Sequence, residues 1–94
     1  MSAARQFPSE FVDRLIAGDG QAFNELVDQT SAGIYGLGLR MLGNAQDAED
    51  MLQETFLKAH NALRGFEKRS SLYTWLYRIA TNEALMMLRR RKSE

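Results

Sequence analysis

The chain contains no cysteine, and this absence excludes two common kinds of structure in a small domain. Without thiols the protein can form neither a disulfide framework nor a thiolate metal site. His60 is the single histidine, and one histidine cannot by itself build a metal centre or a catalytic triad. We therefore expect a protein that is not an enzyme and that uses neither a metal nor another cofactor.

Long apolar runs are also missing. No segment approaches the roughly 20 apolar residues that cross a bilayer, and Met1–Pro8 lacks the apolar centre of a signal peptide. These absences predict a soluble, cytoplasmic protein without membrane insertion. The chain has one proline and is 45% hydrophobic, which favours a compact fold over disorder. A length of 94 residues fits one domain.

The net charge of zero conceals an uneven distribution of charge along the chain. Residues 1–63 carry four basic and nine acidic residues, whereas residues 64–94 carry eight basic and three acidic residues. Such polarity suggests two partners of opposite character, and the basic segment would face a polyanion. An uneven scatter of solubilising charges is the alternative explanation.

Glycines divide the chain into four stretches with helical periodicity, which predicts an all-α fold, a compact bundle of about four helices. The first begins after Pro8, with Ser9 as its N-cap, and stops at Gly18. The second runs from about Gln21 to Leu42. Three glycines inside it indicate either close helix packing or a kink: Gly33, Gly36 and Gly38.

The third helix has the clearest start, because Asn44 can cap it and Asp47 places a carboxylate near its positive end. Its predicted inner side consists of Ala48, Met51, Leu52, Thr55, Phe56, Ala59, Ala62 and Leu63. Acidic and amide side chains fall on the opposite side together with Leu57. An apolar residue inside an acidic stripe is typical of a protein-binding patch, although single exposed leucines are common in monomers.

The fourth helix follows a loop, is capped by Ser70 or Ser71, and ends in the basic tract Arg89–Lys92. Its predicted inner stripe is Leu72, Trp75, Leu76, Ile79, Ala80 and Met87, and Glu83 leans toward this side, where it could pair with a neighbouring arginine. The residues predicted to project outward are Thr74, Arg78, Thr81, Asn82, Leu85 and Arg89.

These outward groups suit nucleic acid. Arg78 can neutralise phosphates and Asn82 can form paired hydrogen bonds with a base edge. Tyr73 and Tyr77 could stack on unpaired bases or could instead belong to the edge of the core.

Three strings of the sequence carry a family resemblance: Arg40–Asn44 (RMLGN), Asp47–Ala59 (DAEDMLQETFLKA) and Thr74–Asn82 (TWLYRIATN). In this order they resemble region 2 of the extracytoplasmic-function (ECF) sigma factors of the sigma-70 family, and the resemblance extends over roughly residues 9–92. It implies a sigma2-type fold in which a polymerase-binding helix precedes a promoter-reading helix. Residues 1–94 would form a single sigma2 domain.

The resemblance also implies partners and sites. The third helix would bind the clamp helices of the β′ subunit of core RNA polymerase through Asp47, Asp50, Gln53, Glu54, Leu57 and Lys58. The following loop and helix would recognise the promoter −10 element and trap its melted non-template strand through Lys68, Arg69, Ser70, Ser71, Tyr73, Thr74, Tyr77, Arg78, Thr81, Asn82, Arg89 and Arg90. An anti-sigma factor is a further expected partner.

Two departures from the family pattern concern the loop and the chain length. The family commonly has a glycine near position 68, where this chain has a lysine. The sigma4 helix-turn-helix domain that such factors carry is absent from this chain, which we interpret as an excised domain. The rival hypothesis is a sigma-like interaction module that binds an anti-sigma factor or regulator without DNA; the basic last third of the chain argues against it.

Overall fold

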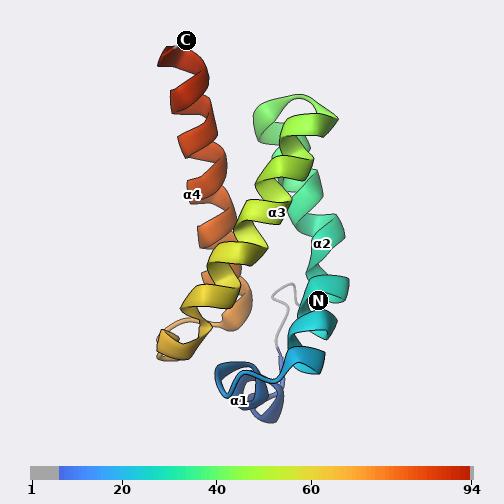
Figure 1. Cartoon of the computed structure of the whole chain (residues 1–94), viewed down its shortest axis with the longest axis vertical. Helices are drawn as coiled ribbons and strands as arrows, with labels where there is room; N and C mark the ends of the chain where they lie inside the picture. Colours follow the sequence, from blue (N-terminus) through green and yellow to red (C-terminus); the bar gives the residue numbers. More distant parts are fainter. Residues whose placement is uncertain (1–6, 94) are drawn as a thin grey trace, which may run out of the picture.

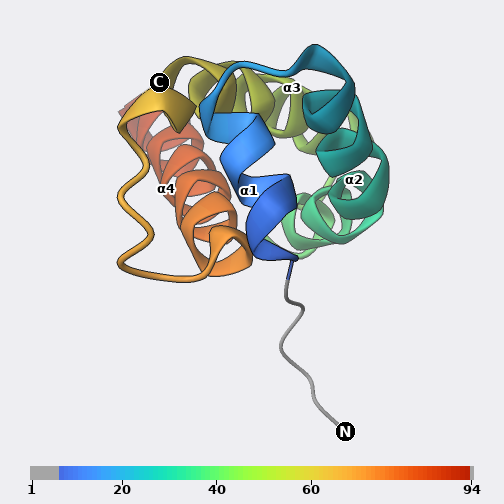
Figure 2. The ribbon, with the colours of Figure 1, turned by 90° about the horizontal axis from the view of Figure 1, so that it is seen from below.

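The computed structural model describes residues 7–93, and these form four α-helices and one short 3-10 turn. The helices are α1 (Ser9–Ile16), α2 (Gly20–Leu42), α3 (Ala45–Ala62) and α4 (Leu72–Ser93), and the 3-10 turn η1 (Leu63–Gly65) follows α3. Successive long helices run in opposite directions, and α1 lies at one end between α2 and α4 (Figures 1 and 2). The predicted all-α bundle is confirmed. Within the described residues, no helix has the length and apolar character needed to cross a membrane.

Side-chain caps set most of the helix starts. The Asn44 Oδ1 atom accepts from the Asp47 amide at 2.9 Å, as predicted, and the Ser71 hydroxyl oxygen accepts from the Thr74 amide at 3.0 Å. Asp19 caps α2 by accepting from the Gln21 amide at 2.9 Å. The prediction for Ser9 is wrong: Pro8 is the N-cap, and Ser9 is already the first helical residue.

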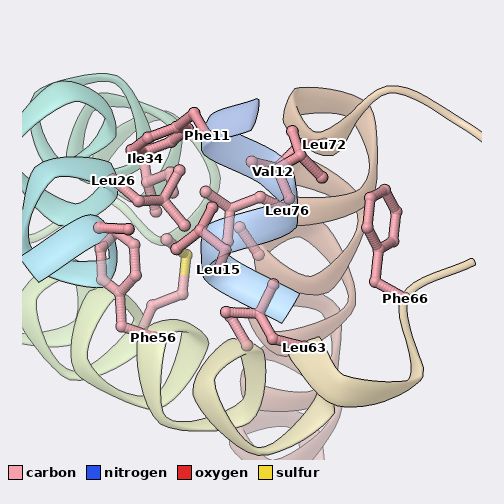
Figure 3. Close-up of a cluster of buried hydrophobic side chains, with 14 of the residues drawn as sticks. Phe11, Val12, Leu15, Leu26, Ile34, Phe56, Leu63, Phe66, Leu72 and Leu76 are labelled. Atoms are coloured by element: carbon pink, nitrogen blue, oxygen red, sulfur yellow. The ribbon is translucent and has the colours of Figure 1, made fainter. Parts of the chain in front are cut away.

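The core lies where the four helices meet, and Figure 3 shows side chains from each of them interdigitating. The largest fully buried apolar side chains are Leu15, Leu26, Ile34, Met51 and Leu76. Burial of each such side chain stabilises the fold by about 1.5–3 kcal/mol. Most of the inner residues predicted for α3 and α4 are buried or half-buried. Ala62 is an exception and is exposed where the chain tightens into η1, whereas Leu63 is buried as predicted.

Close packing between α2 and α3 explains one glycine. A Cβ atom added at Gly38 would lie 3.1 Å from both the Cα and the Cβ atom of Ala48. Contacts this short are tighter than ordinary van der Waals packing, so the absence of a side chain lets the two helices approach. The packing alternative therefore holds at this position, and α2 continues unbroken to Leu42.

Candidate functional site

The outward side of α3 presents acidic and amide groups around one exposed leucine. Asp50 and Gln53 are exposed and Glu54 is half-buried. Leu57 is 60% exposed, more than any other large apolar residue that the structure describes. Asp47, at the start of the helix, is half-buried and accepts hydrogen bonds from Asn44 and Arg91, which lower the pKa of its carboxyl group. An apolar centre with a polar rim is the composition of a protein-docking surface.

An apolar groove of about 530 Å³ runs beside Leu57, between α2 and α3. Its walls are Phe23, Val27 and Ser31 from α2 and Leu52, Gln53, Phe56, Leu57 and His60 from α3. The contribution of α2 was not predicted. The four-residue spacing of Phe23 and Val27 places them on one helix face, but spacing alone cannot show that this face borders the acidic stripe.

Lys58 differs from the other predicted polymerase-binding residues because its side chain turns toward α4. The Lys58 Nζ atom donates to the Glu83 Oε1 atom at 2.6 Å, and Arg90 Nη2 lies 3.7 Å from the other carboxylate oxygen. Glu83 is only 4% exposed, which confirms that it leans inward. The arginine partner was foreseen, but the closer cation is a lysine from the neighbouring helix. Lys58 therefore lies at the border between α3 and α4.

One side of α4 carries a continuous exposed row. Thr74, Arg78, Asn82, Leu85 and Arg89 are exposed and Thr81 is half-buried, as their helical phase predicts. Arg78 and Asn82 are one turn apart, so a guanidinium group and a carboxamide lie next to each other on the same face. This arrangement can contact a phosphate and a base edge of one strand.

Aromatic rings border this row on both sides. Tyr73 and Tyr77 are half-buried, and their ring centroids lie 4.3 Å apart at an interplanar angle of 32°. On the other side, Trp75 packs on Phe66 with ring centroids 5.0 Å apart. Tyr73, Tyr77 and Trp75 combine flat apolar surface with partial exposure, which is the character of stacking platforms for unpaired bases, whereas Phe66 is buried.

The loop between η1 and α4 places basic groups beside the exposed row. Lys68 has a φ of 62°, in the left-handed region that glycine adopts most readily, and this is the position where the family resemblance led us to expect glycine. The Lys68 Nζ atom pairs with the Asp13 Oδ1 atom of α1 at 2.5 Å. This ion pair connects the loop to helix α1. The two residues are 55 positions apart in the sequence, so no local pattern predicts their contact.

Two surface hollows flank this loop. One, of about 350 Å³, is lined by Gly65, Phe66, Glu67, Arg69, Ser70, Trp75 and Arg78. The other, of about 200 Å³, is lined by Phe7, Ser9, Val12, Phe66, Lys68, Ser70, Ser71 and Leu72. The structure thus brings together the loop residues and the first half of α4 that were predicted to bind DNA.

The basic end of α4 lies farther along the helix. Arg89 stands 11 positions after Arg78 in the sequence. At about 1.5 Å per residue this places it roughly 16 Å farther along the axis. Arg89 and Arg90 are exposed, and Arg91 forms an ion pair with Asp47 at 2.5 Å. Within residues 7–93, no cluster of histidine and carboxylate side chains could hold a metal ion.

Comparison with known proteins identifies the family. The model of sigma-70 region 2 matches residues 26–94. The chain belongs to the sigma-70 region 2 family. It is similar to the RNA polymerase sigma-H factor of Pseudomonas aeruginosa, with 47% identity over 80% of this chain and 39% of the relative. It is also similar to the ECF sigma factor SigW of Bacillus subtilis, with 43% identity over 82% of this chain and 41% of the relative.

The region 2 domain thus spans about two fifths of the length of these curated relatives. These similarities confirm the predicted ECF resemblance, and the family to which the chain belongs is one of transcription initiation factors rather than enzymes. A solved structure of an engineered region 2 of sigmaE, in complex with GTAAAA, has the same fold with a TM-score of 0.81 and 35% identity. That match covers 96% of this region 2 domain and 95% of the solved chain.

Proposed function

We propose that this region 2 domain binds core RNA polymerase through the outward face of α3 and captures the melted non-template strand of the promoter −10 element with α4 and its preceding loop. One observation carries the proposal: the exposed row around Arg78 and Asn82 is bordered by aromatic rings and adjoins a basic, hollowed loop. The engineered region 2 of sigmaE, which has this fold, was solved in complex with GTAAAA, and this supports binding of an oligonucleotide of that kind here.

Each part of the surface has a distinct role in capture. Arg78 neutralises phosphates, and Lys68 and Arg69 do so by exchanging their carboxylate partners Asp13 and Glu67 for phosphate. Asn82 hydrogen-bonds to a base edge. A base swung out of the stack enters the hollow between Arg69 and Trp75, where the Ser70 hydroxyl and backbone groups can contact it. Extrusion costs a few kcal/mol, and stacking on aromatic rings at about 1–3 kcal/mol per base offsets that cost. The domain therefore acts as a trap for an open strand in the cytoplasm, where polymerase works.

The polymerase contact depends on Leu57. Its exposed side chain and the adjoining groove bury against the β′ clamp helices, while Asp47, Asp50, Gln53 and Glu54 form the polar rim. A basic partner would be steered to this acidic surface. An anti-sigma factor that covers the same groove would block polymerase binding, which explains how such a partner could regulate the domain.

Two binding assays test the proposal. Single-stranded DNA selected from a random library should bind more weakly as salt rises, and Asn82→Ala should reduce the preference between selected and scrambled strands. Asn24→Ala, at an exposed asparagine on α2, is the matched control. Failure of the chain to bind any strand, even with core polymerase present, would support the interaction-module hypothesis instead.

The second assay measures affinity for core polymerase. Asp50→Lys with Leu57→Ala should weaken it while leaving helical content unchanged. The control pair, Glu10→Lys with Leu39→Ala, changes an exposed acid on α1 and an exposed leucine on α2 away from the groove. Equal affinity of the two double variants for core polymerase would refute the proposed patch.

A further inference from the structure

Helix α2 carries a glycine against which a tyrosine of α4 rests. A Cβ atom added at Gly33 would lie 2.2 Å from the hydroxyl oxygen of Tyr77 but 3.5 Å from the Cζ atom of the same ring. The first distance is impossible for two non-bonded atoms, whereas the second is ordinary van der Waals contact. The space left by the missing side chain of Gly33, here called the seat, therefore accommodates the Tyr77 hydroxyl group specifically. A phenylalanine ring in the same place would leave room for the methyl group of an alanine at position 33.

The seated ring is part of the surface that borders the exposed row of α4. Tyr77 holds Tyr73 at a centroid separation of 4.3 Å, so displacement of one ring disturbs both. Arg78 follows Tyr77 directly and Asn82 lies a little more than one turn farther on. The glycine on α2 thus lies against the ring that forms the aromatic edge beside these polar groups.

We propose that Gly33 is a positioning residue of the strand-binding surface, which seats the Tyr77 phenol against α2 and thereby holds the Tyr73–Tyr77 pair as a preformed stacking edge for unpaired bases. The inference rests on the proposed function. A preformed platform binds a flexible strand more tightly because less side-chain ordering remains to be done on binding. Glycine at this place costs the helix propensity that alanine would supply, which is consistent with a requirement for the seat.

Gly36 supplies a matched control on the same helix. A Cβ atom there would meet only the end of the flexible Arg40 side chain, at 3.6 Å. We therefore compare Gly33→Ala, Gly36→Ala, Tyr77→Phe and the double variant Gly33→Ala/Tyr77→Phe. Thermal melting and affinity for a library-selected single strand are measured for each, together with the ratio of its affinities for selected and scrambled strands.

If Gly33 seats the Tyr77 hydroxyl, Gly33→Ala should change the melting temperature in opposite directions when this hydroxyl is present and when it is removed. Gly36→Ala should raise the melting temperature through better helix propensity. Gly33→Ala should lower it when Tyr77 is present and raise it in the Tyr77→Phe background. For DNA, Gly33→Ala should reduce affinity at least about fivefold, the effect of losing one base stack, for selected and scrambled strands alike, because stacking does not depend on base sequence. The double variant should bind like Tyr77→Phe alone.

Other results would overturn the inference. If Gly33→Ala melts and binds like Gly36→Ala, the seat does not exist. If the double variant is as impaired as Gly33→Ala, the glycine acts through something other than the phenol. If melting follows the prediction but strand affinity does not change, the seat is structural only. Failure of the unmodified chain to bind any strand would refute the proposed function and, with it, the role of Gly33 in strand binding. The melting comparison would still decide whether the seat exists.

Discussion

The buried carboxylate of Glu83 offers a quantitative test of how α3 and α4 are held together. Glu83 is 4% exposed and depends on the Lys58 Nζ atom at 2.6 Å, with Arg90 at the longer distance of 3.7 Å. Lys58→Met removes the near cation and leaves the carboxylate without its closest partner. Breaking a fully buried pair costs about 3–5 kcal/mol. Lys58 is 42% exposed, so water can reach the site. We therefore expect a smaller loss of about 2 kcal/mol, in the range for a hydrogen bond to a charged group.

The double variant Lys58→Met/Glu83→Met provides the decisive comparison. Because it removes the charge as well as its partner, it should be more stable than Lys58→Met alone by about 1 kcal/mol or more. Urea unfolding followed by circular dichroism measures both differences. Lys92→Met, at an exposed lysine in the last turn of α4, is the control and should change stability by less than about 0.5 kcal/mol. An unchanged midpoint in Lys58→Met, or a double variant less stable than the single one, would refute this account of the pair.

Three further perturbations test the packing, the loop and the cap of α2. Gly38→Ala should destabilise the fold by about 1–3 kcal/mol in urea unfolding, because the new methyl group would meet the backbone of Ala48 at 3.1 Å. At the left-handed position 68, Lys68→Gly should be more stable than Lys68→Ala by about 1 kcal/mol, since both lose the lysine side chain but only alanine retains the unfavourable φ; equal midpoints would contradict this.

The hydrogen bond from Arg14 holds the pKa of Asp19 below its ordinary value of 3.8, so the stabilisation is present above that value and is lost as the pH falls through the lowered pKa. The thermal-melting advantage of the unmodified chain over Asp19→Asn should therefore disappear in strong acid, and an advantage that persists there would count against the ion pair.

Local patterns predicted most of the helical architecture because caps and apolar periodicity act within a few residues. Asn44 caps α3 as its sequence context indicates, and the outward phase of Leu57 and Asn82 follows from the helical repeat. The errors arise where geometry changes between elements. Ser9 lost its cap role because the helix begins one residue earlier than expected, and Ala62 became exposed where α3 tightens into a 3-10 turn.

Contacts between distant segments were beyond the reach of periodicity. The pair of Lys58 with Glu83 spans 25 positions and the pair of Lys68 with Asp13 spans 55. Each depends on how helices cross, which a hydrophobic stripe constrains only coarsely. The sequence indicated that Glu83 faces inward, but it could not name the lysine that makes this burial tolerable. The roles of the predicted DNA-binding and polymerase-binding residues remain predictions, which the binding assays above address.

The Lys58–Glu83 pair also reports the rotation of the two helices relative to each other. Lys58 follows Leu57 directly, and Glu83 follows Asn82 directly. Neighbouring residues of an α-helix project about 100° apart, so a pair that faces across the α3–α4 contact turns Leu57 and Asn82 away from it on their own helices. The rotation that brings Glu83 to Lys58 therefore also points outward the residue at the centre of the proposed polymerase patch and the proposed base-reading residue. A slip of either helix about its axis would misdirect its binding residue and leave Glu83 buried without its cation.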